Sequence, residues 1–227
     1  MLSDSEAIWD NEYSKAHIIP SSVRESPSQA LLLFTELLGM RRLHHALDAG
    51  CGNGRNSLYL AQLGLQVNAI DFSSAGLNEA AKRVAKAGFT GNVTLDKGSL
   101  EEVFPFQANY FDVCLDFYVF CHFLDKNLKL HYVEELLRVT RPGGYLITTL
   151  FSPKDEYYAS LVQPGSQPNI VKDPANGIVK ELYPEEGFKK AFAPPFHLQY
   201  FVGFEFDDMV LGKSYHRHIL AMALQKQ

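Results

Sequence analysis

Between residues 45 and 151 the sequence alternates between strand-like and helix-like patterns. Short apolar stretches at 45–50, 66–71, 92–98, 110–120 and 145–151 have the composition of buried strands, and stretches with apolar residues at helical spacing cover 29–38, 55–64, 73–88 and 127–140. A tight turn cannot join two parallel strands, so this order predicts parallel strands with crossover connections. We therefore expect an α/β fold with a doubly wound, mostly parallel sheet.

The segment after residue 151 has a different composition. Seven of the 11 prolines lie between residues 151 and 196, where only 185–192 has a helical pattern. Two strand-like runs follow, at 198–208 and 216–225, and a turn near Gly212 separates them. We expect an antiparallel C-terminal hairpin at one edge of the sheet. The predicted single domain, 1–227, then comprises an N-terminal helical lid (1–39), a ligand-binding core (40–151), a cap insertion (152–197) and the hairpin (198–227).

Composition narrows the function classes. Hydrophobic residues make up 46% of the chain, enough for a sizeable core, and the net charge is -5 with no basic stripe, which disfavours double-stranded nucleic acid as a partner. The 3 cysteines, Cys51, Cys114 and Cys121, contain no Cys-x-x-Cys pair, which argues against disulfides and a zinc site. The acidic N-terminus resembles no signal peptide, and no apolar run reaches membrane-spanning length. We expect a cytoplasmic protein without a membrane partner.

The stretch "ALDAGCGNGRNSLYLAQLG", residues 46–64, places three glycines between a strand and a helix. Such a turn brings the main chain close to a ligand beside the helix N-terminus. The dinucleotide fingerprint G-x-G-x-x-G fits Gly50 and Gly52, but Arg55 stands in place of its third glycine. A nicotinamide dinucleotide is thus disfavoured, and an adenosine-containing ligand without a pyrophosphate is preferred.

Residues 48–54, Asp-Ala-Gly-Cys-Gly-Asn-Gly, resemble motif I of the class I S-adenosylmethionine-dependent methyltransferases. The continuation "GRNSLYLAQLG" is similar to their small-molecule branch, which includes the tellurite- and thiopurine-type methyltransferases, and the resemblance spans about 40–151. It implies a seven-stranded Rossmann-like sheet, S-adenosylmethionine as cofactor, S-adenosylhomocysteine as product, and in-line methyl transfer to a small molecule. A catalytically silent binding module, and a methyltransferase acting on protein or RNA, remain alternatives.

The resemblance also assigns residues to the cofactor. Asp71, which ends the second strand, would accept both ribose hydroxyls, and Phe72 beside it would pack on the adenine. Where the family usually has Gly-Asp after its third strand, this sequence has Gly98-Ser99, which leaves the adenine contact open. The predicted cofactor-binding residues are Asp48, Gly50, Cys51, Gly52, Asn53, Gly54, Asp71, Phe72, Ser73, Ser99, Leu100, Asp116 and Phe117.

The sequence is less informative about the residues that would bind the methyl acceptor. Trp9 and Tyr13 have the spacing of the family's N-terminal lid, although an ordinary amphipathic helix would pack the same rings. His216 and His218 alternate and so share one face of a strand, with Arg217 on the other face. His122, His216 and His218 are candidate bases and Arg217 is a candidate anion clamp. Solvated side chains at a strand start are the preferred explanation of His216, Arg217 and His218. The sequence predicts no metal site.

Overall fold

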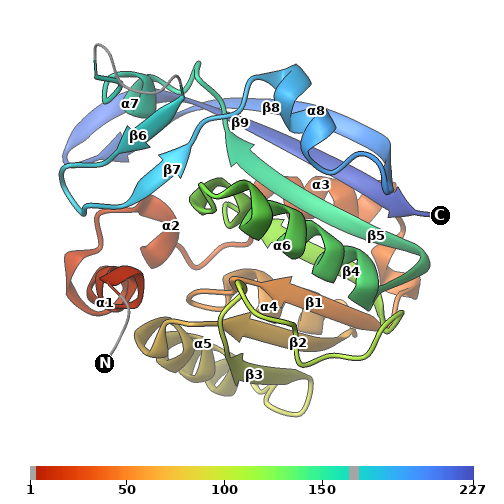
Figure 1. The fold of residues 1–227 in the computed structure, drawn as a ribbon. Helices are drawn as coiled ribbons and strands as arrows, with labels where there is room; N and C mark the ends of the chain where they lie inside the picture. Colours follow the sequence, from red (N-terminus) through yellow and green to blue (C-terminus); the bar gives the residue numbers. More distant parts are fainter. Residues whose placement is uncertain (1–3, 164–168) are drawn as a thin grey trace.

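The computed structural model describes residues 4–163 and 169–227. Its core is a seven-stranded sheet with the order β3-β2-β1-β4-β5-β9-β8 (Figure 1). The strands from β1 to β5 pair in parallel, whereas β9 is antiparallel to both β5 and β8. The doubly wound sheet and the C-terminal hairpin are confirmed. The strands are β1 (His45–Ala49), β2 (Gln66–Asp71), β3 (Val93–Lys97), β4 (Phe111–Phe117), β5 (Thr140–Phe151), β8 (Phe196–Val210) and β9 (Lys213–Lys226).

Helices cover both faces of the sheet. One hydrophobic cluster packs α3 (Gln29–Leu37), α4 (Arg55–Gln62) and α5 (Ser74–Ala87) against one face. A second cluster packs α6 (Lys126–Val139) and α8 (Glu185–Ala191) against the other. All seven residues of β4 are buried between the two layers, which explains why its sequence is almost continuously apolar.

The helix ends follow the local sequence. Ser73 precedes α5 and accepts a hydrogen bond from Gly76 N, and Gly88 ends the helix in the left-handed conformation with φ +80°. Asp125 caps α6 by accepting bonds from Asn127 N and Leu128 N. These caps fix where each crossover helix starts, and hence which residues stand at the strand ends.

Two parts of the chain differ from the sequence-based expectations. The strand expected at 145–151 begins earlier, because "RPGG", 141–144, forms the start of β5, with a register irregularity between Phe111 and Val113 on the neighbouring strand. Arg141 bonds to the Asp112 carboxylate on β4, which holds this segment in the sheet. The cap also contains α7 (Glu156–Ala159) and a two-stranded sheet of β6 (Ile170–Lys172) and β7 (Val179–Glu181), which no sequence pattern indicated.

The N-terminal segment lies across the carboxyl ends of β1 and β2 (Figure 1). It contains α1 (Asp4–Asn11), a π-helical turn (Glu12–Ala16) and α2 (Pro20–Val23); we call residues 4–23 the lid segment. The buried carboxylate of Glu12 accepts bonds from Ile19 N and Ser22 Oγ and so ties the lid segment to itself. Residues 1–3 of the predicted lid and 164–168 of the predicted cap lie outside the described residues.

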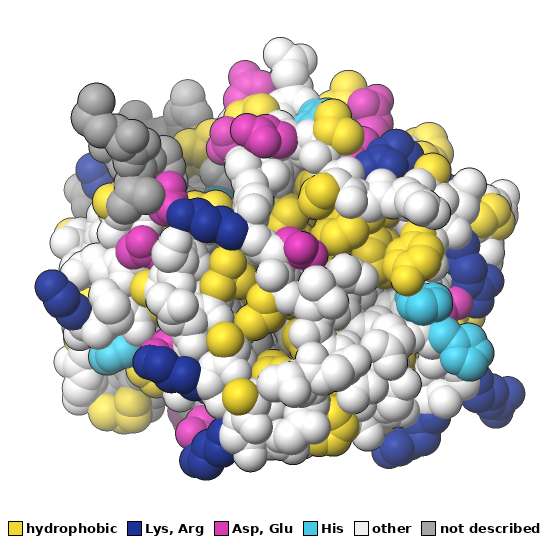
Figure 2. All heavy atoms as spheres, turned by 90° about the horizontal axis from the view of Figure 1, so that it is seen from below, with side chains coloured by type: hydrophobic (Ala, Val, Ile, Leu, Met, Phe, Trp, Pro, Cys, Tyr) yellow, Lys and Arg dark blue, Asp and Glu magenta, His cyan; other side chains and the backbone are white. Residues whose placement is uncertain are grey.

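Within the described parts of the chain, no helix is both long enough and apolar enough to cross a membrane. Figure 2 shows one face of the molecule, where Lys and Arg side chains are scattered singly among polar and hydrophobic groups. That face therefore carries no basic stripe that could follow a nucleic-acid backbone.

Candidate functional site

The turn between β1 and α4 is contacted from two sides. Gly52 and Gly54 have φ values of +54° and +73°, a region that L side chains rarely adopt. A Cβ at Gly54 would lie 2.7 Å from Ala80 Cβ of α5, and a Cβ at Gly52 would lie 2.1 Å from Tyr13 Oη of the lid segment. These two glycines thus allow the close approach of a helix on one side and of an incoming ring on the other.

Arg55 and Asn53 face the N-terminal segment rather than the turn. The Arg55 guanidinium is buried and donates to Ser26 O and Ser28 Oγ, each at 2.9 Å. Asn53 Nδ2 donates to Ser22 O at 2.9 Å. The close helix contact expected of a third glycine is made here by Gly54 and α5. Cys51 is buried beneath the turn, and that burial raises the pKa of its thiol.

Asp48, in β1, is hydrogen-bonded to a residue of α4. Its Oδ2 accepts a 2.5 Å bond from Ser57 Oγ, and the residue is buried. Burial raises the pKa of Asp48 to about 6 despite that bond. This bond ties the end of β1 to the first turns of α4.

Asp71 ends β2 beside the glycine turn. Its Oδ2 accepts from Gly52 N and its Oδ1 from Ser73 N, both at 2.8 Å. Burial raises the pKa of Asp71 to about 6, and the two backbone donors oppose that rise. Each carboxylate oxygen has a second lone pair, so Asp71 can still accept bonds from a ligand. We call the carboxyl ends of β1, β2 and β4 the ligand edge, where α/β sheets of this kind bind their ligands.

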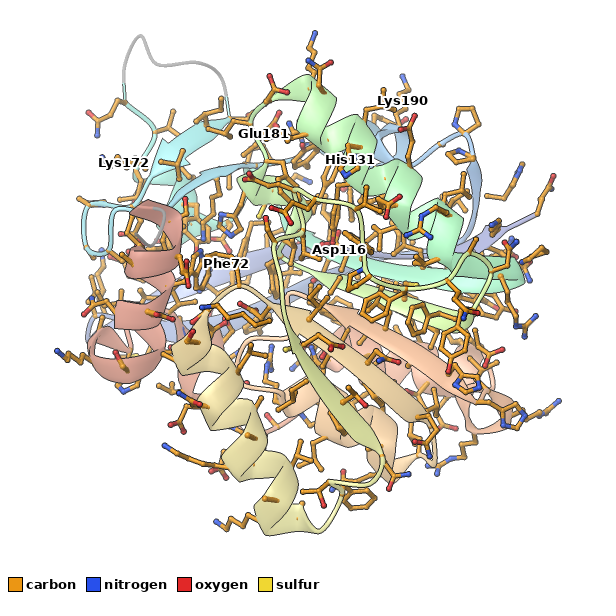
Figure 3. The ribbon with its side chains drawn as sticks, turned by 60° about the horizontal axis from the view of Figure 1, so that its bottom comes forward. Phe72, Asp116, His131, Lys172, Glu181 and Lys190 are labelled. Carbon is orange, nitrogen blue, oxygen red and sulfur yellow. The ribbon has the colours of Figure 1, made fainter. Side chains whose placement is uncertain are left out.

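The residues after Asp71 and after β3 also face this edge. Figure 3 shows Phe72 between the lid segment and the end of the sheet. Leu100 is buried, and its Cδ1 lies 3.8 Å from a Cβ built at Gly50. Ser99 is half-buried, and its hydroxyl accepts a bond from Glu101 N.

The lid segment is fastened to the ligand edge by Asp10. Its Oδ1 accepts from Ser73 Oγ at 2.6 Å and from Ala75 N at 3.0 Å, at the N-terminus of α5. This position satisfies free helix N–H groups and places a negative charge at the positive end of the helix. The contact fixes the start of α5 and holds Tyr13 over the glycine turn, where Trp9 stacks on Tyr13 at a centroid distance of 5.8 Å.

Asp116 lies at the carboxyl end of β4, beneath α6 (Figure 3). Its Oδ1 accepts from Val119 N, Phe120 N and Tyr132 Oη, and its Oδ2 accepts from Thr148 Oγ1. Burial raises the pKa of Asp116 to about 6. These contacts position the segment after β4. Phe117 is buried in the sheet core.

His122 lies between the lid segment and the cap. Its Nδ1 is 2.9 Å from Val179 O, and Trp9 contacts its ring edge-on at a centroid distance of 5.4 Å. Burial, with a smaller effect from the Lys180 charge, lowers the pKa of His122 to about 3. The imidazole is therefore neutral near pH 7, and a neutral ring bonded to a carbonyl carries its proton on Nδ1.

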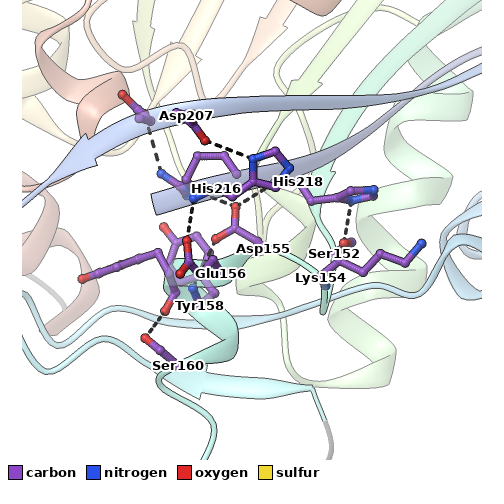
Figure 4. Close-up of polar contacts among 12 residues, drawn as sticks. Ser152, Lys154, Asp155, Glu156, Tyr158, Ser160, Asp207, His216 and His218 are labelled. Carbon is purple, nitrogen blue, oxygen red and sulfur yellow. Dashed lines mark hydrogen bonds and ion pairs between the residues drawn. The ribbon is translucent and has the colours of Figure 1, made fainter. Parts of the chain in front are cut away.

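The other candidate acceptor residues meet at the hairpin and the cap (Figure 4). Arg217 is buried and its Nε donates to Asp155 Oδ2 at 2.8 Å, while Asp208 lies 3.7 Å from its Nη1. His218 is buried and bonded to Ser152 Oγ, whereas His216 is exposed beside Asp207. The two histidines share one face, as expected. The carboxylates of Asp155 and Asp208 neutralise the charge of Arg217 inside the protein.

Around Arg217 the rings of β5 and α7 form an apolar cluster. Its buried members, which we call the cap cluster, are Phe151, Tyr157, Tyr158, Val171, Leu182, Val210 and Ile219. Tyr118, which directly follows β4, stacks on Phe151 with a centroid distance of 4.6 Å. The cap cluster thus adjoins the ligand edge.

Sequence reasoning missed three residues of this region: Asp10, Asp155 and Lys180. Asp10 lies between the predicted lid aromatics, and its spacing from Trp9 carried no signal of its own. Asp155 and Lys180 lie in the proline-rich segment, where no periodicity predicted their orientation. Among residues 4–163 and 169–227 no group of three or more His, Cys, Asp or Glu side chains is arranged to hold a metal.

The comparison with known proteins agrees with the fold. Residues 47–148 match the family model described as a methyltransferase domain. The structure superposes on that of 1,6-didemethyltoxoflavin-N1-methyltransferase from Burkholderia thailandensis, which was solved with 1,6-didemethyltoxoflavin and S-adenosylhomocysteine bound. The TM-score is 0.69 and the identity 18%, and the match covers 100% of this chain and 92% of that one. The chain has a Rossmann-like α/β fold shared with solved S-adenosylmethionine-dependent methyltransferases, and residues 47–148 are similar to a methyltransferase domain.

Two curated relatives show how far the sequence likeness extends. Ribosomal protein L11 methyltransferase of Campylobacter fetus is 33% identical over 134 residues, which are 56% of this chain and 42% of that protein. Malonyl-[acyl-carrier protein] O-methyltransferase of Salmonella typhimurium is 34% identical over 136 residues, 57% of this chain and 46% of that protein. The chain spans less than half the length of either relative, and their named acceptors differ.

Proposed function

We propose that this chain is an S-adenosylmethionine-dependent methyltransferase acting on a small-molecule acceptor. The observation that carries the proposal is the pairing of Asp71 with Gly52 N at the ligand edge, because it joins the strand-end acid to the glycine turn of the predicted cofactor motif. The likeness of residues 54–64 to the tellurite- and thiopurine-type branch supports the choice of a small acceptor.

The residues of the ligand edge fit such a cofactor. Tyr13 Oη of the lid segment fills the space beside Gly52 where a Cβ would lie, so the cofactor would take the place of this ring, and Asp71 keeps two lone pairs for ribose hydroxyls. Phe72 is half-buried beside them and offers a ring to the adenine. When bound, S-adenosylmethionine would supply a methyl group on a positively charged sulfur, to be displaced in line by the acceptor nucleophile.

The chain's own residues would then mainly orient the acceptor and exclude water. The lid segment places Tyr13 directly over Gly52 and Gly76, and Trp9 stacks on Tyr13, so the segment would close over both ligands. His122 is held neutral with Nδ1 engaged. That arrangement suits an acceptor that is already a good nucleophile and needs positioning more than proton removal.

The first test is calorimetric titration of the purified chain with S-adenosylmethionine, S-adenosylhomocysteine and NAD. We expect both sulfur ligands to bind and NAD not to bind. Binding of NAD alone would overturn the proposal in favour of an oxidoreductase.

Turnover then separates the remaining alternatives. Release of S-adenosylhomocysteine in the presence of small acceptors, and not of protein or RNA, is expected. Cofactor binding without turnover of any acceptor class would instead identify a silent binding module.

A further inference from the structure

Two buried cations lie against the same cap cluster, and they are compensated differently. Arg217 has the carboxylate of Asp155 at 2.8 Å and that of Asp208 at 3.7 Å. Lys180, which is only 3% exposed, has no carboxylate within 4 Å in the described chain. Burying a charge without a counter-ion is costly, so a lysine kept in this position calls for an explanation.

Lys180 stands at an inward position of the small cap sheet. It pairs in register with Val171, which is 1% exposed, whereas Val179, next to it, pairs with the exposed Lys172. Because side chains alternate between the faces of a strand, the position of Lys180 is one where an apolar residue would be expected. Figure 3 shows Lys172 and Glu181 on this same sheet.

The ammonium group of Lys180 is poorly satisfied by the protein. Its Nζ lies 4.1 Å from the centroid of the Tyr158 ring and 5.2 Å from that of Phe151. The structure gives it one hydrogen bond, to Tyr158 Oη at 2.6 Å. An ammonium has three donors, and rings compensate only part of its charge. Two donors remain for an anion that the described residues do not supply.

Lys180 also lies close to the ligand edge. Its charge affects Cys121, whose pKa burial raises to about 12 while Lys180 opposes the rise, and it contributes to the low pKa of His122. Both residues belong to the turn after β4, in which Val119 contacts Gly50 so closely that a Cβ there would lie 2.3 Å from Val119 Cγ2. One short turn therefore joins the glycine turn to Lys180.

We propose that Lys180 is the specificity-determining residue for the acceptor, that it binds an anionic oxygen, and that the acceptor is accordingly a small organic acid. The inference rests on the proposed function, since it names the substrate class of that site. Tyr118, Phe151 and Tyr158 supply the apolar walls around the acid, and Trp9 and His122 bound it toward the lid segment.

The acid must enter by displacing the lid segment. With the lid in place, the cavity beside the cap cluster, lined by Ile18, Ile19, Tyr157, Tyr158 and Arg217 among others, measures about 10 Å³. That volume is room for one water molecule. Because Trp9 belongs to the lid segment and contacts His122, displacement of the lid will change the fluorescence of this one tryptophan of the chain.

The test uses matched carboxylates and amides as probes. Benzoate, phenylacetate and cinnamate, and the corresponding primary amides, are titrated into the full chain with S-adenosylhomocysteine present, and Trp9 fluorescence is followed. We expect at least one acid to bind about tenfold more tightly than its amide, as is typical of a charge-assisted hydrogen bond. Lys180→Met should abolish this preference and Lys180→Arg should retain part of it.

Lys172→Met is the matched control, since it removes an exposed lysine from the same two-stranded sheet. It should keep the preference for acids. Each variant is checked for its melting temperature and its affinity for S-adenosylhomocysteine. If Lys180→Met does not fold, Lys180→Gln takes its place, and a glutamine variant that keeps the preference for acids counts against the proposal.

The outcomes are distinguishable. A wild type that binds S-adenosylhomocysteine but prefers no acid, or a Lys180→Met variant that keeps the preference, overturns the inference and leaves the proposed function intact. A lower melting temperature in Lys180→Met with unchanged acid binding shows a purely structural lysine. Failure to bind S-adenosylhomocysteine refutes the proposed function itself.

Discussion

The ligand edge and the cap cluster are built in opposite ways. At the ligand edge, residues 48–73 provide the glycine turn, Asp48, Asp71 and Ser73, and most of their polar partners are backbone groups or neighbours in sequence. The cap cluster joins side chains from β5, α7, β6, the loop after β7, β8 and β9, and its central ion pair links Asp155 to Arg217.

The two regions therefore differ in how the sequence encodes them: one is encoded by a local motif, and the other is assembled from distant segments of the chain. Backbone donors and glycine conformations are encoded locally and recur with the motif. The buried charges of the cap depend on counter-ions from distant segments and are particular to this chain. A cofactor common to a class suits the first kind of site, and an individual acceptor suits the second. Substitutions in the cap cluster should therefore mainly lower stability, whereas substitutions at the ligand edge should mainly weaken cofactor binding.

The largest effect is expected from Arg217→Met. It leaves the fully buried Asp155 carboxylate without its main partner, which costs about 3–5 kcal/mol of unfolding free energy. Chemical denaturation measures this loss. Arg24→Met is the control: Arg24 pairs with Asp208 but its side chain is 37% exposed, so its loss should cost less than about 1 kcal/mol.

An Arg217→Met variant of unchanged stability would contradict the structural role and favour the earlier interpretation of Arg217 as an anion clamp. The comparison between the two regions would then have to be redrawn, because the cap cluster would use both of its cations for a ligand.

Gly52→Val should abolish cofactor binding while leaving most of the fold intact. A valine there has φ +54° and meets Tyr13 Oη, and the same bulk would fill the ligand edge. We expect affinity for S-adenosylhomocysteine to fall about 100-fold or more, because the valine side chain would occupy space that the cofactor needs. The backbone strain would lower the free energy of unfolding by about 1–3 kcal/mol. Gly91→Val, where a Cβ meets nothing within 4 Å, should bind normally in the same titration.

Asp71→Ala tests the ribose assignment. Loss of a charged acceptor should weaken binding by about 2 kcal/mol, or roughly 30-fold. Because Asp71 also holds Gly52 N and Ser73 N, the decisive readout is discrimination between adenosine and 2′,3′-dideoxyadenosine. Wild type should prefer adenosine and Asp71→Ala should not; a preference that survives would remove Asp71 from the ribose site. Asp207 is an exposed acid in the hairpin, so Asp207→Ala should change neither the cofactor affinity nor the preference for adenosine.

His122→Asn tests the boundary between the two regions through pH. The folded-state pKa of about 3 lies below the ordinary 6.5, so His122 contributes stability that is complete above pH 6.5 and is lost as the pH falls toward 3. At pH 5.5, one unit below the unfolded pKa, the wild type should have lost about 1.4 kcal/mol more than the variant.

Denaturation curves at pH 8 and pH 5.5 give this difference, because groups that titrate in both proteins cancel. His216→Gln is the control at an exposed histidine. This variant should still lose the additional free energy of unfolding between pH 8 and pH 5.5 that His122 causes. Equal losses in wild type and His122→Asn would mean that His122 becomes protonated freely in the folded state.

The same contrast explains how much the sequence could predict. Periodicity and caps were sufficient for β1, α4, β2 and α5, since each is a local pattern, and the hairpin followed from two long strand-like runs. The sheet β6–β7 was missed because its strands have three residues each. Lys180 and Asp155 could not be found, because burial of a charge is decided by segments far apart in the chain.

The position of β9 has a consequence for how the chain folds. β9 lies between β5 and β8 and bonds to both, so the hairpin cannot join the sheet through β8 alone. During synthesis, the open edge of β5, with buried residues such as Ile147 and Leu150, waits without a partner until residues 213–226 emerge. An unpaired apolar strand edge invites pairing with other chains. This interval is when the nascent protein is most exposed to aggregation.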